Sequence, residues 1–411
     1  MKKTKNSFYD VLIIGGGAAG FFAAINTKLH YPEKTVAILE KTNKVLSKVK
    51  ISGGGRCNVT HACSNISEMI KAYPRGKNFL KKSFHQFFTH DLIEWFALRN
   101  IRLKTENDGR MFPVTDSSQT IIDCFLQECE KLAIPILLQK DIHIINKKSG
   151  IFEINTKENE VFNSEFLILC SGGYPNQSNY SWIKNIGKEI EEPYPSLFTF
   201  NLPKHPITKL MGLSVENVIV EIPIAKLKQG GPLLITHWGM SGPAIIKSSA
   251  WGAKKLKECN YKFDYIINFL PDFHPDKLGN YFMQEKENWS KKSMQSKMFK
   301  EIPQRLWNYF LQEANLLEKN WADANKKQLF HLARLLTKNV FSANGKTTFK
   351  EEFVTAGGII TSEVNPHSLE SNTIKNLYFA GECLNIDGIT GGFNFQAAWT
   401  TAFIASKLGK K

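Results

Sequence analysis

The chain has 411 residues, of which 42% are apolar, and its 53 lysines and arginines against 38 aspartates and glutamates give a formal charge of +15 at pH 7. This length predicts two or three domains with enough apolar residues for a core in each, which excludes a disordered or collagen-like chain. The seven cysteines are odd in number and none stands in a CxxC or zinc-like spacing, so they indicate reduced thiols in a cytoplasmic protein and no metal site.

The first forty residues predict one strand–helix–strand unit. Apolar residues favour strands at 10–14 and 35–39, and the segment from Ala18 to His30 has the pattern of a helix. A basic N-terminus followed by apolar residues is also typical of a signal peptide, but glycines interrupt the apolar run and it is too short to span a bilayer. We therefore expect a cytoplasmic protein without a membrane span.

The next part of the chain alternates between helical and strand patterns. Helices are predicted at 66–73, 78–88, 91–98 and 117–132, and strands at 134–138, 142–145, 152–155 and 165–170. The last of these strands runs into Ser171, Gly172 and Gly173. This is a second transition from a strand to glycine, after the one that begins at Gly15.

The composition changes near Glu191, where prolines exclude helices and the alternating segments 215–222 and 261–269 predict antiparallel strands. From 276 to 338 the pattern is helical, and strand and glycine patterns return near residue 351, with a strand at 376–380 and a final helix at 394–408. We therefore expect four segments. They are the first part of a nucleotide-binding domain (1–191), an inserted β domain (192–275), a helical subdomain (276–345) and a return segment of the first domain (346–411).

The first strand and helix enclose a GxGxxG motif formed by Gly15, Gly17 and Gly20, and Glu40 follows at the end of the second strand. In dinucleotide-binding folds the first glycine allows a tight turn, the second lets the backbone approach a pyrophosphate on the helix N-terminus, and the third allows close helix packing. An acidic residue about twenty positions further on binds a ribose hydroxyl. The motif therefore predicts a bound dinucleotide.

NAD and FAD both use this fingerprint, and two features favour FAD. A second glycine-rich strand–turn–helix lies at 377–398, as required if one extended dinucleotide is held by both ends of the chain. A helix that starts near Asn394 would direct its positive end at a reduced isoalloxazine, and Gly391 with Gly392 would let the ring approach. No other GxGxxG occurs, so the sequence contains no separate nicotinamide domain.

Four stretches, ILEKTNKVLSKVKISGGGRCNVTH, ITHWGMSGPAII, VTAGGIITSEV and NLYFAGECLNIDGITGGFNFQAAW, resemble the bacterial NAD(P)/FAD-dependent oxidoreductases of the BaiN/RdsA family, also called the aminoacetone oxidase family. The resemblance runs from end to end. It implies an α/β fold in which a Rossmann-like FAD-binding domain of the glutathione reductase and fumarate reductase flavoprotein type is interrupted by a β-rich insertion and a helical subdomain. It also implies bound FAD.

Carried over residue by residue, the resemblance implies where FAD binds. The pyrophosphate would lie on the first glycine turn and over Ser171 and Gly172, the adenosine ribose on Glu40, and adenine on the backbone of Ile142. The ribityl chain and the flavin would lie along the GGGRCN stretch and the C-terminal glycine turn. The complete expected set is Gly15, Gly17, Ala18, Ala19, Gly20, Glu40, Lys41, Lys50, Ser52, Gly54, Arg56, Asn58, Ile142, Ser171, Gly172, Gly381, Glu382, Asp387, Gly391, Gly392, Phe393 and Asn394.

Arg56 and His237 are the candidate catalytic residues. The guanidinium of Arg56 offers a fixed donor fork for a reduced flavin or an anionic substrate, and a structural ion pair within its loop is an equally good interpretation. Histidine side chains often act as proton donors, which makes His237 a candidate, although a hydrogen-bonded histidine at a domain junction is the more common case. Cys57 has no resolving partner two residues away, which disfavours a flavin disulfide reductase.

We expect hydride transfer through flavin N5, with reduction of a C=C bond conjugated to a ketone as one reaction that the family implies. NAD(P)H would then dock transiently at the flavin as the reductant, or the electrons would come from elsewhere. An amine oxidase that uses oxygen and a tRNA-modifying flavoprotein remain the alternatives. The basic residues are 46 lysines and only 7 arginines, scattered along the chain, so the sequence favours a small-molecule substrate over nucleic acid. It leaves the oligomeric state open.

Overall fold

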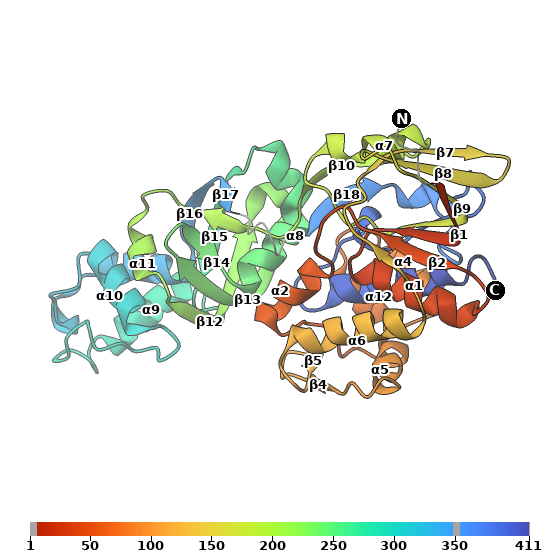
Figure 1. The fold of residues 1–411 in the computed structure, drawn as a ribbon. Helices are drawn as coiled ribbons and strands as arrows, with labels where there is room; N and C mark the ends of the chain where they lie inside the picture. Colours follow the sequence, from red (N-terminus) through yellow and green to blue (C-terminus); the bar gives the residue numbers. More distant parts are fainter. Residues whose placement is uncertain (1–5, 348–353, 411) are drawn as a thin grey trace. The chain divides into compact units, whose positions relative to one another are not determined.

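The computed structural model describes residues 6–347 and 354–410. Two compact units divide the chain, one formed by Met1–Ser196 with Lys350–Lys411 and the other by Leu197–Phe349. The colours of Figure 1 show this division, because the red, orange and dark blue ends of the sequence share one unit and the green to light blue middle forms the other.

A mixed sheet forms the centre of the first unit. Its parallel strands are β6 (Ile136–Leu137), β2 (Val36–Leu39), β1 (Asn6–Ile14), β9 (Val161–Leu169) and β19 (Leu377–Phe379), and β8 (Ile151–Thr156) and β7 (Ile142–Lys148) extend it in antiparallel fashion. Ile14 pairs with Leu39 and with Leu169, and Leu169 also pairs with Phe379. The loops that follow β1, β2, β9 and β19 therefore emerge at the same edge of the sheet, which is where α/β folds bind ligands.

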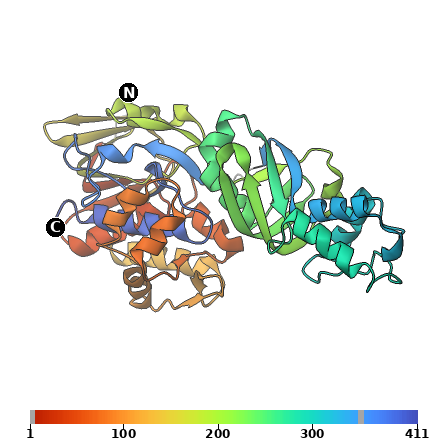
Figure 2. The same cartoon turned by 180° about the vertical axis from the view of Figure 1, so that it is seen from behind.

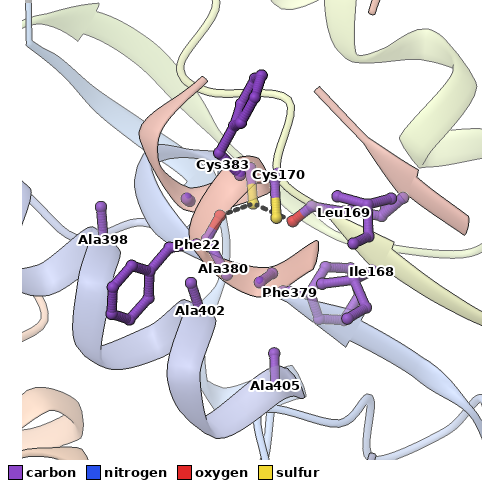
Figure 3. Packing of buried hydrophobic residues seen from close by; sticks show 14 of the residues in the cluster. Phe22, Ile168, Leu169, Cys170, Phe379, Ala380, Cys383, Ala398, Ala402 and Ala405 are labelled. Carbon is purple, nitrogen blue, oxygen red and sulfur yellow. Dashed lines mark hydrogen bonds between the residues drawn. The ribbon is translucent and has the colours of Figure 1, made fainter. Parts of the chain in front are cut away.

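Three long helices pack with this sheet. They are α1 (Ala18–His30), α6 (Ser118–Lys131) and α12 (Phe393–Ser406). Alanines of α12 let it approach α1 and the ends of β9 and β19 closely. Figure 3 shows this cluster, with Phe22 from α1, Leu169 at the end of β9, Cys170 directly after it, Ala380 and Cys383 after β19, and Ala398, Ala402 and Ala405 from α12. Both chain ends thus share one core.

Shorter elements complete the first unit. The helices are α2 (Ser47–Gly55), α3 (Ile66–Met69), α4 (Lys77–Ser83), α5 (Thr89–Ala97) and α7 (Ser181–Asn185), with 3₁₀ turns η1 (Ile70–Ala72), η2 (Gln177–Tyr180), η6 (Thr361–Glu363) and η7 (Gly381–Cys383). A three-stranded antiparallel sheet joins β3 (Thr60–His61), β5 (Arg110–Pro113) and β4 (Leu103–Thr105). This small sheet was not expected from the sequence, because strands of two to four residues are too short to show a recognisable alternation of apolar and polar residues.

The second unit is built on an antiparallel sheet in the order β16-β15-β12-β13-β14-β11-β17. The strands are β11 (Thr199–Asn201), β12 (Ser214–Ile222), β13 (Leu227–Thr236), β14 (Gly239–Ser241), β15 (Lys262–Asn268), β16 (Asn339–Asn344) and β17 (Lys346–Thr347). Short turns are η3 (Pro206–Leu210), η4 (Pro223–Ala225) and η5 (Trp321–Asp323). Figure 2 shows, from behind, helices α9 (Pro275–Glu285), α10 (Gln304–Glu313) and α11 (Lys326–Thr337) gathered at one end of this sheet.

Helix α8 (Pro243–Glu258) lies within the region expected to be largely β and corrects that expectation. Pro243 stands at its first position, where a proline is tolerated, and Ala244, Ser248 and Leu256 are buried on one face against β12 and β13. This helical period was present in the sequence, but the flanking strand patterns concealed it.

The boundaries of the two units also differ from the expected ones. Strand β10 (Ile190–Pro195) crosses residue 191 and pairs with β18 (Thr355–Ile359) inside the first unit. Strand β17 belongs to the second unit because it pairs with β11. The division therefore falls after Ser196 and after Phe349 instead of after residues 191 and 345. Strand pairing sets these boundaries, and the change in composition occurs a few residues before each of them.

Candidate dinucleotide-binding site

The turn between β1 and α1 has three glycines with different surroundings. Gly15 has a φ of 114°, and a Cβ there would collide with the carbonyl group of Cys170, while a Cβ on Gly20 would collide with the carbonyl oxygen of Gly15. At Gly17 a Cβ would have nothing within 4 Å. Gly17 is also the N-cap of α1 and provides no side-chain cap, so the first turn of the helix presents N–H donors beside open space. This arrangement suits a pyrophosphate.

Glu40 is fixed at the end of β2 by hydrogen bonds to both carboxylate oxygens. Oε2 accepts from the Gly16 N–H at 2.7 Å, and Oε1 accepts from the N–H and hydroxyl of Thr42 at 2.9 and 2.8 Å. The Glu40 carbonyl accepts from the Lys140 N–H at 2.8 Å, which brings the segment before Ile142 next to Glu40. Ile142 itself is buried at the start of β7. Glu40, which is expected to bind the ribose, and Ile142, which is expected to contact adenine, thus lie in neighbouring segments.

Two lysines expected near the cofactor are exposed. The ammonium group of Lys41 lies 4.5 Å from the centre of the Tyr174 ring. Lys50 projects from α2, and its carbonyl accepts a hydrogen bond from Ser118 Oγ at 2.7 Å. After β9, Gly172 has a φ of 72° and open space at its missing Cβ. Together with Ser171 it forms the loop beside the Gly15 turn, because the Cys170 N–H donates to the Ile14 carbonyl at 2.8 Å.

The glycine-rich stretch at the end of α2 departs from helical geometry. Ser52 has extended backbone angles, and Gly53, Gly54 and Gly55 have φ values of 58°, 68° and 86°. The Ser52 carbonyl accepts from the Cys57 N–H at 2.9 Å, which closes the loop. Gly54 and Gly55 have nothing within 4 Å of an added Cβ. The loop therefore exposes backbone that a ligand can approach closely.

Arg56 is held by acidic side chains that the sequence analysis did not identify. Its Nη1 lies 2.6 Å from Glu106 Oε1 and 3.5 Å from Asp116 Oδ1, and its guanidinium stacks on Phe112 at 4.0 Å. The hydrogen bond to Glu106 raises the pKa of Arg56. Glu106 lies between β4 and β5, 50 residues further along the chain, and Asp116 follows β5, 60 residues further along. Arg56 therefore forms structural ion pairs, and its partners are Glu106 and Asp116.

The GGGRCN stretch contacts the C-terminal glycine turn directly. In the orientation that satisfies both of its groups, the Asn58 carboxamide donates to the Thr60 carbonyl at 3.1 Å and accepts from the Gly392 N–H at 2.9 Å. Gly392 has a φ of 91°, and a Cβ there would collide with Thr60. Thr60 Oγ1 donates to Gln396 Oε1 at 2.6 Å. Segments more than 330 residues apart therefore form one surface.

The residues around the start of α12 are also fixed by local contacts. The ring of Phe393 stacks on His61 with centroids 4.6 Å apart, and His61 Nδ1 lies 3.1 Å from the Gly391 carbonyl. The side chain of Asn394 accepts from the Gly388 N–H at 2.8 Å and donates to its carbonyl at 2.9 Å. This helix begins without a side-chain cap, as α1 does.

Gly381 and Glu382 follow β19. The Gly381 N–H donates to Thr401 Oγ1 at 2.9 Å, and a Cβ on Gly381 would collide with Ala19 of α1. The Glu382 carboxylate accepts from the Thr355 N–H at 2.9 Å and pairs with the Lys48 ammonium at 2.6 Å. Glu382 therefore links the return segment to α2 across the edge of the sheet.

Asp387 was expected to close over the ribityl chain, but the structure gives its carboxylate protein partners. It is fully buried, pairs with Arg75 through both oxygens, and accepts a hydrogen bond from Ser196. Burial raises the pKa of Asp387, and Arg75 opposes that rise. Arg75 has no motif around it, so nothing in the sequence identified it.

All of the expected cofactor residues belong to the first unit, whereas His237 belongs to the second. His237 is exposed in the turn between β13 and β14, with its ring 4.2 Å from that of Trp238. Cys57 is buried, and burial raises its pKa to about 12, which agrees with a packed thiol. Within residues 6–347 and 354–410, no cluster of His, Cys, Asp and Glu could hold a metal ion, and no helix is long and apolar enough to cross a membrane.

Comparison with known proteins identifies relatives of the whole chain. The family described as HI0933-like protein Rossmann domain matches residues 9–408. The ribosomal RNA dihydrouridine synthase of Haemophilus influenzae is 26% identical over 97% of this chain and 98% of that protein. The 3-dehydro-bile acid delta(4,6)-reductase of Clostridium scindens is 26% identical over 96% of this chain and 97% of that protein.

Among solved structures, the 3-ketosteroid-delta4-(5alpha)-dehydrogenase of Rhodococcus jostii, determined with 4-androstene-3,17-dione, has a TM-score of 0.55 at 11% identity. The match covers 100% of this chain and 99% of that one. At this identity the likeness shows the fold. The family match and this likeness confirm the expected α/β Rossmann-type fold.

Proposed function

We infer that this chain, which belongs to the HI0933-like Rossmann-domain family, is an FAD-dependent oxidoreductase. One observation carries this conclusion. The Gly17 turn with Glu40 offers a site for an adenosine and a pyrophosphate, and the segments at Asn58 and Gly392, which suit the flavin half, meet in the same unit. A ligand with both halves, such as FAD, fits this pair of sites better than a mononucleotide.

We propose that the reaction is the reduction of a C=C bond conjugated to a carbonyl group. The names of the two curated relatives share this chemistry, because dihydrouridine is uridine with its ring C=C bond reduced, and a 3-oxo bile acid with a 4,6-diene is a conjugated enone. When bound, FAD supplies the hydride for such a reduction from N5.

The residues of this chain bind and orient the cofactor. The N–H groups in the first turn of α1 bind negative charge on the pyrophosphate, and Glu40 accepts hydrogen bonds from ribose hydroxyls. The N-terminus of α12, which starts after Gly392, stabilises negative charge on the flavin ring. Arg56 adds positive charge to the exposed glycine loop while Glu106 holds it in place.

The test is an anaerobic titration of the purified protein followed by visible absorption. We expect a flavin spectrum that NADH or NADPH bleaches under nitrogen and that an added enone restores. Bleaching by a small amine, with recovery in oxygen, would support the amine oxidase alternative. A folded preparation that is colourless and takes up no FAD would contradict the proposal.

Uridine in RNA is a second candidate substrate. Single lysines are scattered along the whole chain, but the division into two units places most of the net positive charge in the second unit, which favours this candidate. Residues 197–349 contain 22 lysines and arginines against 12 aspartates and glutamates, a net charge of +10, whereas the longer remainder of the chain has a net charge of +5. Phosphate contacts to such a unit would make RNA binding salt-dependent. RNA binding that weakens at least tenfold between roughly 50 and 200 mM salt would support this candidate.

A further inference from the structure

Residues 72–76 run along the loop that precedes α12, and we call them the 72–76 bracket. The Ile389 N–H donates to the Ala72 carbonyl at 2.9 Å, and Tyr73 Oη donates to the Phe393 carbonyl at 2.7 Å. Gly76 lies so close to Ile386 that no Cβ would fit. The bracket therefore contacts both ends of the 386–393 loop.

Arg75 forms the central contact of the bracket. Its Nε and Nη2 donate to the two carboxylate oxygens of Asp387, and Nη2 also donates to Ser196 Oγ at 3.0 Å. The side chain of Arg75 is 17% exposed and that of Asp387 is 0% exposed. A buried carboxylate without its partner is strongly unfavourable, so this pair fixes the loop in one position. A planar fork matches two oxygens, which a lysine ammonium cannot do.

Asp387 stands between the two C-terminal segments of the proposed flavin site. Glu382 lies five residues before it, and Gly392, whose N–H donates to the Asn58 carboxamide oxygen, lies five residues after it. A shift of Asp387 would therefore displace both segments. The Asp387 carboxylate is already paired with Arg75 and Ser196. Asp387 therefore contributes to cofactor binding by fixing the position of the loop and not by contacting the cofactor.

We propose that Arg75 is a positioning residue of the flavin site, which acts through Asp387 on the 386–393 loop. This inference rests on the proposed FAD site. It predicts that Arg75 determines the affinity for FAD and the surroundings of the ring, although it lies outside the set of residues that hold the cofactor.

The experiment compares Arg75→Lys and Arg75→Gln with Arg99→Lys and Arg99→Gln. Arg99 is a matched control in the same unit, since it is 12% exposed, pairs with Glu128 at 3.0 Å and stacks on Trp95 at 3.5 Å, away from the loop. The dissociation constant of FAD is measured by titrating each apoprotein, and visible circular dichroism reports the asymmetry around the bound flavin. Thermal unfolding of the apoproteins measures stability.

We expect FAD to bind at least tenfold more weakly to Arg75→Gln and at least threefold more weakly to Arg75→Lys, with an altered dichroism spectrum in both. The Arg99 variants should lose stability but keep the wild-type affinity and spectrum. If Arg75→Gln does not fold, Arg75→Lys decides, because it retains the charge. Wild-type affinity and spectrum in Arg75→Lys would overturn the inference. Failure of the wild-type protein to bind FAD would instead overturn the proposed function.

Discussion

Gly17 and Gly20 stand three residues apart in one turn, yet an added methyl group should have opposite effects at the two positions. Gly17 has a φ of −94°, which any residue adopts, and open space where a Cβ would point. Gly20 is buried, and its missing Cβ faces the Gly15 carbonyl. We therefore expect the first glycine to be needed for ligand binding and the second to be needed for the fold.

Gly17→Ala should weaken FAD binding at least tenfold without lowering the stability of the apoprotein, because the methyl group enters only the space proposed for the pyrophosphate. Titration with FAD and thermal unfolding of the apoprotein measure the two effects. Gly230→Ala, at a position with ordinary backbone angles and no neighbour closer than 3.7 Å, is the control. Unchanged FAD affinity in Gly17→Ala would argue against a pyrophosphate at this turn.

Gly20→Ala should lower the free energy of unfolding of the apoprotein by about 3 kcal/mol, because α1 must move away from the Gly15 turn to accommodate the methyl group. Urea unfolding of the apoprotein measures this change. A stability equal to that of Gly17→Ala would show that the turn relaxes more easily than its close contacts indicate.

Buried thiols make stability depend on pH in the alkaline range. Burial raises the pKa of Cys57, Cys124, Cys129 and Cys383 to about 12. In the unfolded chain a thiol ionises near pH 8.5. Each buried neutral thiol therefore contributes its full stabilisation of the folded state below that pH and loses it as the pH rises toward 12, at about 1.4 kcal/mol per pH unit. Urea unfolding at increasing pH should therefore show stability falling above pH 8.5 or so. Cys57→Ser should reduce the slope.

At the scale of elements, helix α12 joins the end of the chain to its beginning. Trp399 is fully buried, lies among Phe22, Phe125 and Phe395, and donates its indole N–H to the Val59 carbonyl at 3.0 Å. Val59 directly follows Asn58, so the packing of α12 also positions the GGGRCN stretch. Trp399, which is not among the expected cofactor residues, thus supports residues that are.

Trp399→Phe should lower the free energy of unfolding by about 1 to 2 kcal/mol through loss of the Val59 hydrogen bond and some packing, and Trp399→Ala by about 3 to 5 kcal/mol through the cavity it leaves. Urea unfolding of the FAD-free protein distinguishes the two variants. Trp307→Phe, which removes an equivalent hydrogen bond to the Met294 carbonyl in the second unit, should leave FAD affinity unchanged, whereas Trp399→Phe should weaken it.

At the scale of the whole molecule, the chain leaves the first unit after β10 and returns to it just before β18. Strands β10 and β18 run antiparallel to each other, and the Ser196 N–H donates to the Val354 carbonyl at 2.9 Å. The two ends of the interruption are therefore adjacent in the first unit. The expected cofactor residues lie entirely in that unit.

Replacing residues 197–353 by a short glycine–serine linker should yield a folded first unit that binds FAD, because the linker spans only the gap between two paired strands. Visible absorption after reconstitution measures binding, with the full chain as the control. A truncated protein that folds by circular dichroism but remains colourless would show that the second unit is needed for the cofactor.

The residue patterns determined much of this architecture. The helical period of 3.6 residues and the glycine spacing predicted the observed bounds of α1, residues 18–30. The strand predictions at 134–138 and 165–170 overlap β6 and β9. Helix α8 was missed because strand patterns flank it. The predicted helix at 78–88 ends at Ser83 in the structure, and the apolar side chains of Phe84, Phe87 and Phe88 that follow are buried outside it.

The sequence by itself determined the glycine turn between β1 and α1, because the order of strand, turn, helix and acid is readable along the chain. Only the tertiary structure decided that Asp387 pairs with Arg75, that Glu106 holds Arg56 and that Gly392 lies against Thr60. The physical reason is distance along the chain. A pairing between side chains 50 to more than 300 residues apart has no periodicity or spacing, and it exists only once the sheet has brought their segments together.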